Sequence, residues 1–280
     1  MNVVIEKILN NNAIVSLNED KSEIIVMGRG VAFGKSPGDL VDKDRVEKVF
    51  TLENDDLTNK LKELIEEIPM EYMKLSEDII KYAKLQLGKK LNDNIYISLT
   101  DHIHYAVERY SKGLAIKNGL LWETKNLYKE EFQIGMEALK MIDQTLGVRL
   151  PEDEAAFIAL HIVNAELNED IGNIMAMTGI VQEILKIVQY HFLMEFDEES
   201  LNYYRFITHL KFFAQRLVNK EFYEDDEQDD LFEIVKTRYS DSYDCALKIQ
   251  EFIYKKYQYM ITQDEMMYLT IHIERVVRIR

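Results

Sequence analysis

The sequence predicts a mainly α-helical protein, with two tandem repeated helical bundles behind a small N-terminal all-β antiparallel domain. Three observations support this: β-branched segments with Asn-rich turns in the first fifty residues, a helical apolar period from residue 57 on, and an internal repeat within the helical part. The chain has 280 residues, nearly twice a typical single domain. We expect domains at residues 1–56, 57–170 and 171–280.

The first fifty residues contain four short β-branched segments. Asn10–Asn12 and residues 18–21 provide turns between neighbours, because asparagine tolerates positive φ and can bond its own backbone. Antiparallel hairpins are therefore expected. A sheet this small exposes one face unless something covers it, which favours a dimer through the sheet. The predicted strands are residues 3–9, 13–17, 23–27 and 46–50.

The helical part begins after a polar joint at residues 53–56, with Thr58 as a candidate cap for the next helix. Beyond it, apolar residues recur at the spacing of one helix face. The clearest helical segments are residues 95–110, 127–146, 152–167, 180–192, 201–220, 243–257 and 262–277.

The helical part repeats itself. An offset of 107 residues pairs His102 and Arg109 with His209 and Arg216. Further along, an offset of 111 pairs residues 128–138 with 239–249, and residues 153–162 with 264–273. Two copies of one bundle explain both offsets if a loop of the second copy carries a four-residue insertion.

Composition excludes several classes of protein. The chain is 47% hydrophobic and has a single cysteine, Cys245, so neither an intramolecular disulfide nor a cysteine zinc cage is possible. The N-terminus lacks signal-peptide character, and no apolar run approaches the length of a membrane span, so we expect a cytoplasmic protein without membrane insertion. A formal charge of −16 opposes sequence-blind nucleic-acid binding, and any RNA or DNA contact must be local.

Four of the six histidines fall at repeat-equivalent positions, two in each bundle. A single histidine flanked by apolar residues is typically a packing residue, but occupation of both positions in both copies favours a function. The four are His102, His161, His209 and His272.

Two chemistries suit these histidines. A neutral imidazole is a nucleophile that can accept a phosphoryl group and then carries about −2 charge, enough to rearrange packed subunits. The rival is a helical metal-dependent phosphohydrolase built from Asp101, His102, His104 and His161. Its weakness is that Thr208 and Lys211 replace Asp101 and His104 in the second copy. We expect no bound metal or other cofactor.

The third predicted strand is followed by Gly28-Arg29-Gly30, with Phe33 close behind. Glycines let a ligand approach the backbone, arginine pairs with phosphate or a guanine edge, and phenylalanine stacks on an unpaired base. A hairpin turn with an exposed arginine is the alternative. A DNA-binding activator with the same bundles is a further possibility, although the N-terminal strands show no helix-turn-helix pattern.

Together these features resemble the BglG/SacY family of transcriptional antiterminators, which combine a co-antiterminator RNA-binding domain with two phosphotransferase-system regulation domains. The resemblance spans essentially the whole chain. Its most specific segments are Lys7 with residues 10–12, then 26–33, 46–52, 99–103, 159–161, 208–210 and 270–272.

The resemblance implies a sugar-responsive, non-enzymatic regulator whose dimeric β domains grip an RNA hairpin in a leader transcript and prevent terminator formation. Phosphorylation of the first bundle by a sugar permease component (enzyme II) is expected to inactivate the antiterminator. Phosphorylation of the second bundle by the carrier protein HPr is expected to activate it. The four repeated histidines are the implied phosphoacceptors. The implied RNA-contacting residues are Lys7, Asn10, Asn12, Gly28, Arg29, Gly30 and Phe33.

Overall fold

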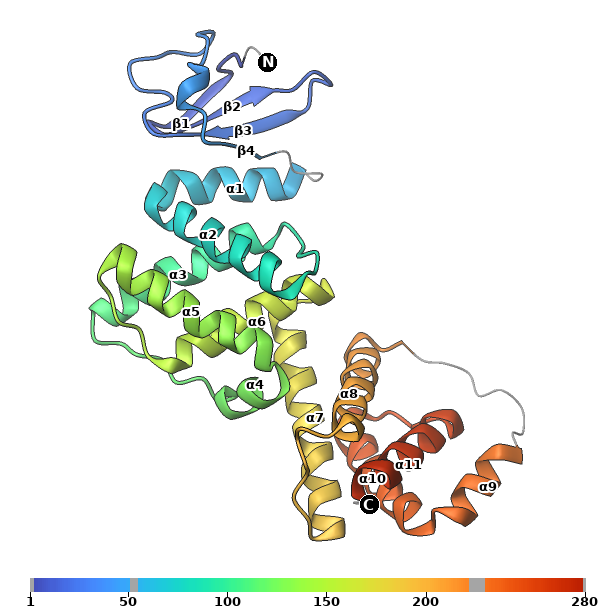
Figure 1. The fold of residues 1–280 in the computed structure, drawn as a ribbon. Helices are drawn as coiled ribbons and strands as arrows, with labels where there is room; N and C mark the ends of the chain where they lie inside the picture. Colours follow the sequence, from blue (N-terminus) through green and yellow to red (C-terminus); the bar gives the residue numbers. More distant parts are fainter. Residues whose placement is uncertain (1–2, 51–54, 222–229, 279–280) are drawn as a thin grey trace. The chain divides into compact units, whose positions relative to one another are not determined.

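A computed structural model describes residues 3–50, 55–221 and 230–278 (Figure 1). It divides into two compact units, and each is considered by itself. The first comprises Met1–Leu121 and Tyr128–Glu169, and the second Trp122–Leu127 and Asp170–Arg280. A small antiparallel sheet followed by helices confirms the predicted fold class.

The sheet has the strand order β1-β2-β3-β4, with every neighbouring pair antiparallel. The second and third predicted strands match the structure, whereas the first and fourth are shorter than expected. The N-terminal residues instead run beside residues 38–41, where Val4 forms an antiparallel bridge with Leu40. The strands are β1 (Lys7–Asn10), β2 (Ala13–Leu17), β3 (Glu23–Met27) and β4 (Lys48–Phe50), with the short helix η1 (Lys43–Arg45) before β4.

Both faces of this sheet are covered by its own chain. On one face Ile25 and Phe50 are buried in a cluster with Leu61 and Ile65 of α1 (Asp55–Glu67). On the other face, strand residues pack beneath the segments that contain Val31 and Val41. The expectation of an uncovered face was therefore wrong, because the first helix after the strands supplies the missing apolar layer. Neither face of the described sheet is therefore open in a way that favours a dimer.

The first bundle consists of α2 (Met70–Leu87), α3 (Ile95–Ser111), α5 (Lys129–Leu146) and α6 (Glu152–Leu167) around a shared apolar core. Thr58 does not cap α1 as predicted, because the helix already begins at Asp55 and Thr58 is buried within it. The segment predicted at residues 127–146 is interrupted at Tyr128 (φ −128°, ψ 55°), which separates α4 (Leu121–Leu127) from α5. Residues 53–54 of the predicted polar joint lie outside the described ranges.

The second unit contains α7 (Ile171–Phe192), α8 (Leu201–Asn219), α9 (Asp230–Arg238), α10 (Ser240–Tyr257) and α11 (Gln263–Val277). Among the described residues, α7 is the one helix long and apolar enough, by length and composition, to cross a bilayer. The sequence predicts no such helix. Ile180 and Ile184 are nevertheless fully buried and α7 packs on α8 and α10, as a core helix of a bundle does.

The repeat seen in the sequence is present in three dimensions. His102 lies on α3 and His161 on α6, while His209 and His272 lie on the corresponding helices α8 and α11. α3 packs on α6 in the first unit, and α8 packs on α11 in the second. Each bundle thereby places its two histidines on facing helices.

Candidate functional site

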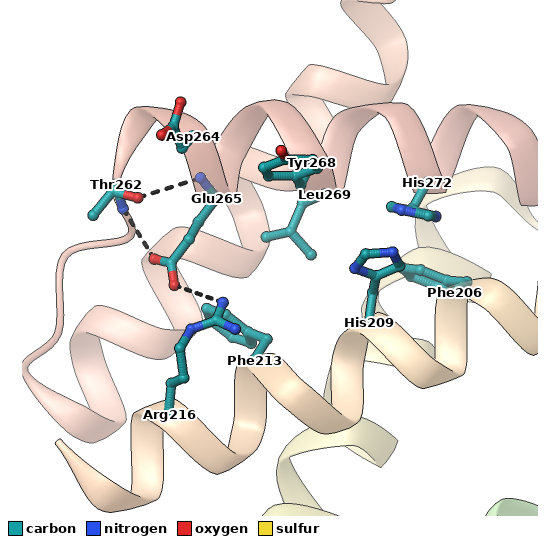
Figure 2. A pocket seen from close by; sticks show the side chains of 10 residues that line it. All are labelled: Phe206, His209, Phe213, Arg216, Thr262, Asp264, Glu265, Tyr268, Leu269 and His272. Carbon is teal, nitrogen blue, oxygen red and sulfur yellow. Dashed lines mark hydrogen bonds and ion pairs between the residues drawn. The ribbon is translucent and has the colours of Figure 1, made fainter. Parts of the chain in front are cut away.

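The histidine pair of the second bundle opens into a cavity of about 480 Å³. The ring centroids of His209 and His272 lie 3.9 Å apart. His209 is exposed, whereas His272 is buried. Figure 2 shows the two imidazoles at one end of the cavity and Arg216 with Glu265 at the other. One imidazole of this pair is therefore within reach of a group that enters from solvent.

Glu265 is held in place by several donors. Its Oε1 pairs with Nη2 of Arg216 at 3.1 Å. Its Oε2 accepts from the Tyr259 hydroxyl at 2.7 Å and from the backbone N–H of Thr262 at 3.2 Å. Thr262 in turn caps α11 through a capping box with Glu265, which fixes the first turn of this helix.

The histidine pair of the first bundle is arranged differently. The ring centroids of His102 and His161 lie 4.9 Å apart. Nε2 of His102 lies 3.0 Å from Oε2 of Glu154, at ion-pair distance but without the alignment of a hydrogen bond. Nη2 of Arg109 lies 3.4 Å from the other oxygen of Glu154. The carboxylate thus lies between a guanidinium and an imidazole.

Burial keeps several of these imidazoles neutral. Desolvation, with a smaller contribution from His102, lowers the pKa of His161 to about 3. Desolvation, then His209 and two arginines, lowers the pKa of His272 to about 4. The pKa of His209 is also lowered, first by partial desolvation and then by Arg216. At pH 7 these rings have a free nitrogen lone pair, the form that attacks phosphorus.

The side chains of the alternative metal site are not brought together. His102 faces His161, whereas the ring of His104 packs edge-on against Tyr72, with centroids 5.0 Å apart. Positions 102 and 104 of one helix point in different directions, so they cannot share an ion with His161. Within the described ranges, no three His, Cys, Asp or Glu side chains form a group able to hold a metal.

The Gly28–Gly30 loop is built on close backbone contacts. A Cβ on Gly28 would lie 1.7 Å from the carbonyl oxygen of Arg45, so only glycine fits. Gly30 has a φ of +65°, and its N–H donates to Oδ1 of Asn12 at 2.7 Å. Nη1 of Arg45 donates to the Gly30 carbonyl at 2.8 Å. These residues shape the loop rather than offer free groups.

The side chains that this loop presents to solvent are Arg29 and Phe33. Both are exposed, and Phe33 has 70% of its surface accessible. The backbone N–H of Arg29 donates to Oε1 of Glu47 at 3.1 Å, which orients the loop and leaves the guanidinium outside. An exposed cation and an exposed aromatic ring on one fixed loop are suited to phosphate pairing and base stacking.

Lys7 and Asn10 contact α1, and Asn10 also accepts a hydrogen bond of 2.8 Å at its Oδ1 from the backbone N–H of Asn12. Nζ of Lys7 pairs with Oε1 of Glu66 at 3.3 Å. Nδ2 of Asn10 donates to the carbonyl oxygen of Ile65 at 2.7 Å. Asn10 thus connects α1 to the loop region that contains Asn12, Gly28, Arg29, Gly30 and Phe33, whereas Lys7 contacts α1.

Four functional residues were not recognised from the sequence: Arg109, Glu154, Arg216 and Glu265. All four occupy paired positions of the repeat, and that pairing was the available signal. Arg45 and Glu47, which support the Gly28–Gly30 loop, had no such signal, because their role depends on a turn that brings residues 45–47 against residue 28.

Comparison with known proteins matches the whole architecture. Residues 3–59 match the family model of the CAT RNA binding domain. Residues 77–165 and 182–276 each match that of the PRD domain. The two PRD matches coincide with the two copies of the repeat, and the CAT match with the sheet and the start of α1.

Two relatives align with this chain over nearly their full length. The chain is 61% identical over 275 residues to the transcription antiterminator LicT of Bacillus subtilis (strain 168), covering 98% of this chain and 99% of that protein. It is 49% identical to the beta-glucoside operon antiterminator of Dickeya chrysanthemi, covering 97% and 96% of the two chains. The crystal structure of GlcT CAT-PRDI aligns with a TM-score of 0.52 at 36% identity, covering 59% of this chain and 99% of that one. The chain therefore belongs to the BglG/SacY-type family of transcriptional antiterminators.

Proposed function

We propose that this protein binds an RNA hairpin in a leader transcript and thereby prevents formation of an overlapping terminator, in response to a sugar. The beta-glucoside operon named for one relative suggests that class of sugar. The protein acts as a regulator without catalysis of its own, in the cytoplasm and without membrane insertion.

The main structural support for the proposed RNA binding is the loop from Gly28 to Phe33. Its backbone is fixed by Asn12, Arg45 and Glu47, while Arg29 and Phe33 project into solvent. The chain has a net charge of −16, so binding rests on a few shaped contacts rather than on general attraction for polyanions. We propose Lys7, Asn10, Asn12, Gly28, Arg29, Gly30 and Phe33 as the residues of this interface.

The regulatory half rests on the two histidine pairs. His102, His161, His209 and His272 are the proposed phosphoacceptors, with enzyme II as donor to the first bundle and HPr as donor to the second. The pKa values of His161 and His272, lowered to about 3 and about 4, keep both rings neutral and nucleophilic at pH 7. A dianionic group on a helix that packs against its neighbour gives phosphorylation a route to subunit rearrangement.

The arrangement of domains and subunits also remains a proposal. We place an RNA-binding domain at residues 1–56 and regulation domains at 57–170 and 171–280. We propose that the active form is a homodimer, as the resemblance to antiterminators implies. Since α1 covers the sheet face with Ile25 and Phe50, a dimer through that face requires α1 to move, and a dimer elsewhere does not.

One experiment tests both halves. The full-length protein is titrated against a fluorescent RNA hairpin from the leader upstream of a neighbouring permease gene, with a base-scrambled hairpin as control. The titration is repeated after incubation with phosphoenolpyruvate and the general phosphotransferase proteins. Preference for the cognate hairpin supports RNA recognition, and a phosphorylation-dependent affinity supports the regulatory assignment. Equal binding of both hairpins would contradict the first half, and an unmodified protein mass the second.

A further inference from the structure

An arginine–glutamate pair accompanies each histidine pair at repeat-equivalent positions. Arg109 pairs with Glu154 in the first bundle, and Arg216 pairs with Glu265 in the second. The two copies differ in what else the carboxylate contacts. That difference decides how each bundle can accommodate a phosphoryl group.

In the second bundle the carboxylate of Glu265 is satisfied without the histidines. The Tyr259 hydroxyl and the Thr262 N–H both donate to its Oε2. Arg216 occupies the other oxygen, at the opposite end of the cavity from the imidazoles (Figure 2). If Arg216 turned toward a new anion, Glu265 would keep two donors.

In the first bundle those two donors are missing. The repeat offset places Val148 where the second copy has Tyr259, and Pro151 where it has Thr262. Valine has no hydroxyl, and proline has neither a hydroxyl nor an N–H. Glu154 is 3% exposed, and its Oε2 lies instead 3.0 Å from His102. The sequence change explains why this carboxylate contacts the histidine.

A phosphoryl group carries about −2 charge, so arginine stabilises it and a buried carboxylate opposes it. In the second bundle the cavity lies between Arg216 and the two imidazoles, with His209 exposed at its edge. In the first bundle the side chain of His102 is only 13% exposed, and a phosphoryl group on its Nε2 would meet Glu154 directly.

We propose that the cavity of the second bundle is a phosphoryl-binding site in which Arg216 holds the phosphoryl group on His209 or His272, while Glu154 opposes one on His102, so that the second bundle accepts phosphate first. This rests on the proposed role of these histidines as phosphoacceptors. Beyond that role, we infer which residue binds the phosphoryl group and in which order the two bundles are phosphorylated.

Phosphoramidate tests this without a donor protein, whose docking would confound the comparison. An imidazole lone pair attacks phosphorus, a new P–N bond forms, and the P–N bond of phosphoramidate breaks. Ammonia leaves with that bonding pair and takes up the proton released by the ring. The full-length protein is followed by peptide mass spectrometry for rate and site, and by ³¹P NMR for the phosphohistidine signal.

For Arg216 the variants are Arg216→Gln and Arg216→Lys. The loss of the guanidinium should slow modification of the second bundle about tenfold or more, shift its ³¹P signal and shorten the lifetime of the phosphohistidine. Lysine should restore part of the rate, because it keeps the charge but not the planar fork. Arg238→Gln, which removes an exposed arginine of α9, is the matched control and should react as the parent does.

For Glu154 the variant is Glu154→Gln, with Glu152→Gln in the same helical turn as control. Removal of the charge beside His102 should accelerate modification of the first bundle about tenfold, and the control should not. If the parent protein is modified in both bundles at equal rates and neither Arg216→Gln nor Glu154→Gln changes them, this inference is wrong and the phosphoacceptor role stands. If none of the four histidines is modified, by phosphoramidate or by the phosphotransferase proteins, the proposed function itself fails.

Discussion

Nδ2 of Asn10 donates a hydrogen bond of 2.7 Å to the carbonyl oxygen of Ile65. This bond ties a proposed RNA-contacting side chain to α1, the helix that covers one face of the sheet. The Lys7–Glu66 ion pair lies beside it. In this conformation two of the seven proposed RNA-contacting side chains are engaged by α1, so RNA bound at these residues would compete with α1 for the same groups.

Release of Lys7 should strengthen RNA binding. Glu66→Gln removes the partner of Lys7, and the affinity for the cognate hairpin should rise about two- to fivefold, because exposed ion pairs are worth at most about 1 kcal/mol. The measurement is fluorescence anisotropy with the full-length protein. Glu67→Gln, the same charge change at the next exposed position, is the control. An equal gain in RNA affinity for both variants would indicate an effect of net charge alone. It would contradict competition between α1 and RNA for Lys7.

Arg29 should contribute directly to RNA affinity. Arg29→Ala should weaken binding of the cognate hairpin by about 1 to 3 kcal/mol, the range for a bidentate base contact or a phosphate contact. Lys43→Ala, which also removes one exposed positive charge near this loop, should have a much smaller effect. Equal losses for the two variants would remove Arg29 from the interface.

Gly28 should be irreplaceable even by alanine. The added methyl group would lie 1.7 Å from the Arg45 carbonyl oxygen, so the loop must separate from residues 45–47. We expect Gly28→Ala to lower the thermal midpoint and to abolish binding of the cognate hairpin. Gly179→Ala in α7, where the space around the new methyl group is open, should be neutral or slightly stabilising. Normal RNA binding by Gly28→Ala would show that the loop shape is not required.

The buried histidines should make stability depend on pH. The pKa of His161 is lowered to about 3 and that of His272 to about 4, while unfolded histidine takes up its proton near pH 6.5. The contribution of these two residues to the free energy of unfolding is therefore complete above pH 6.5. It is lost as the pH falls toward 4, by about 1.4 kcal/mol per pH unit for each residue. Urea titrations at pH 7, 6, 5 and 4 should show this slope. His161→Gln should flatten it, and an unchanged slope would contradict neutral burial.

Much of the fold could be predicted because its signals are local. The residues of β2, β3 and α6 follow from β-branched runs and helical spacing, and the break at Tyr128 was the clearest error in a long helical segment. α1 as the cover of the sheet could not be predicted in this way. Its apolar residues show that it must pack against something, but not against what.

In the candidate sites, too, only some features could be predicted from the sequence. The histidines were found because the duplication places them at equal positions in both copies. Their different environments were not found, because they depend on Val148 and Pro151 being unable to donate to Glu154. The ties from Asn10 and Lys7 to α1 were missed as well, since both join groups more than fifty residues apart.

The most direct test of this account is the affinity of the full-length protein for its cognate RNA hairpin before and after histidine phosphorylation, measured by fluorescence anisotropy against a scrambled hairpin. We predict selective, saturable binding whose dissociation constant changes when phosphoenolpyruvate and the phosphotransferase proteins are supplied, and does not change when all four histidines are replaced by glutamine. An affinity that is the same for both hairpins, or that stays constant although the histidines carry phosphate, would contradict it.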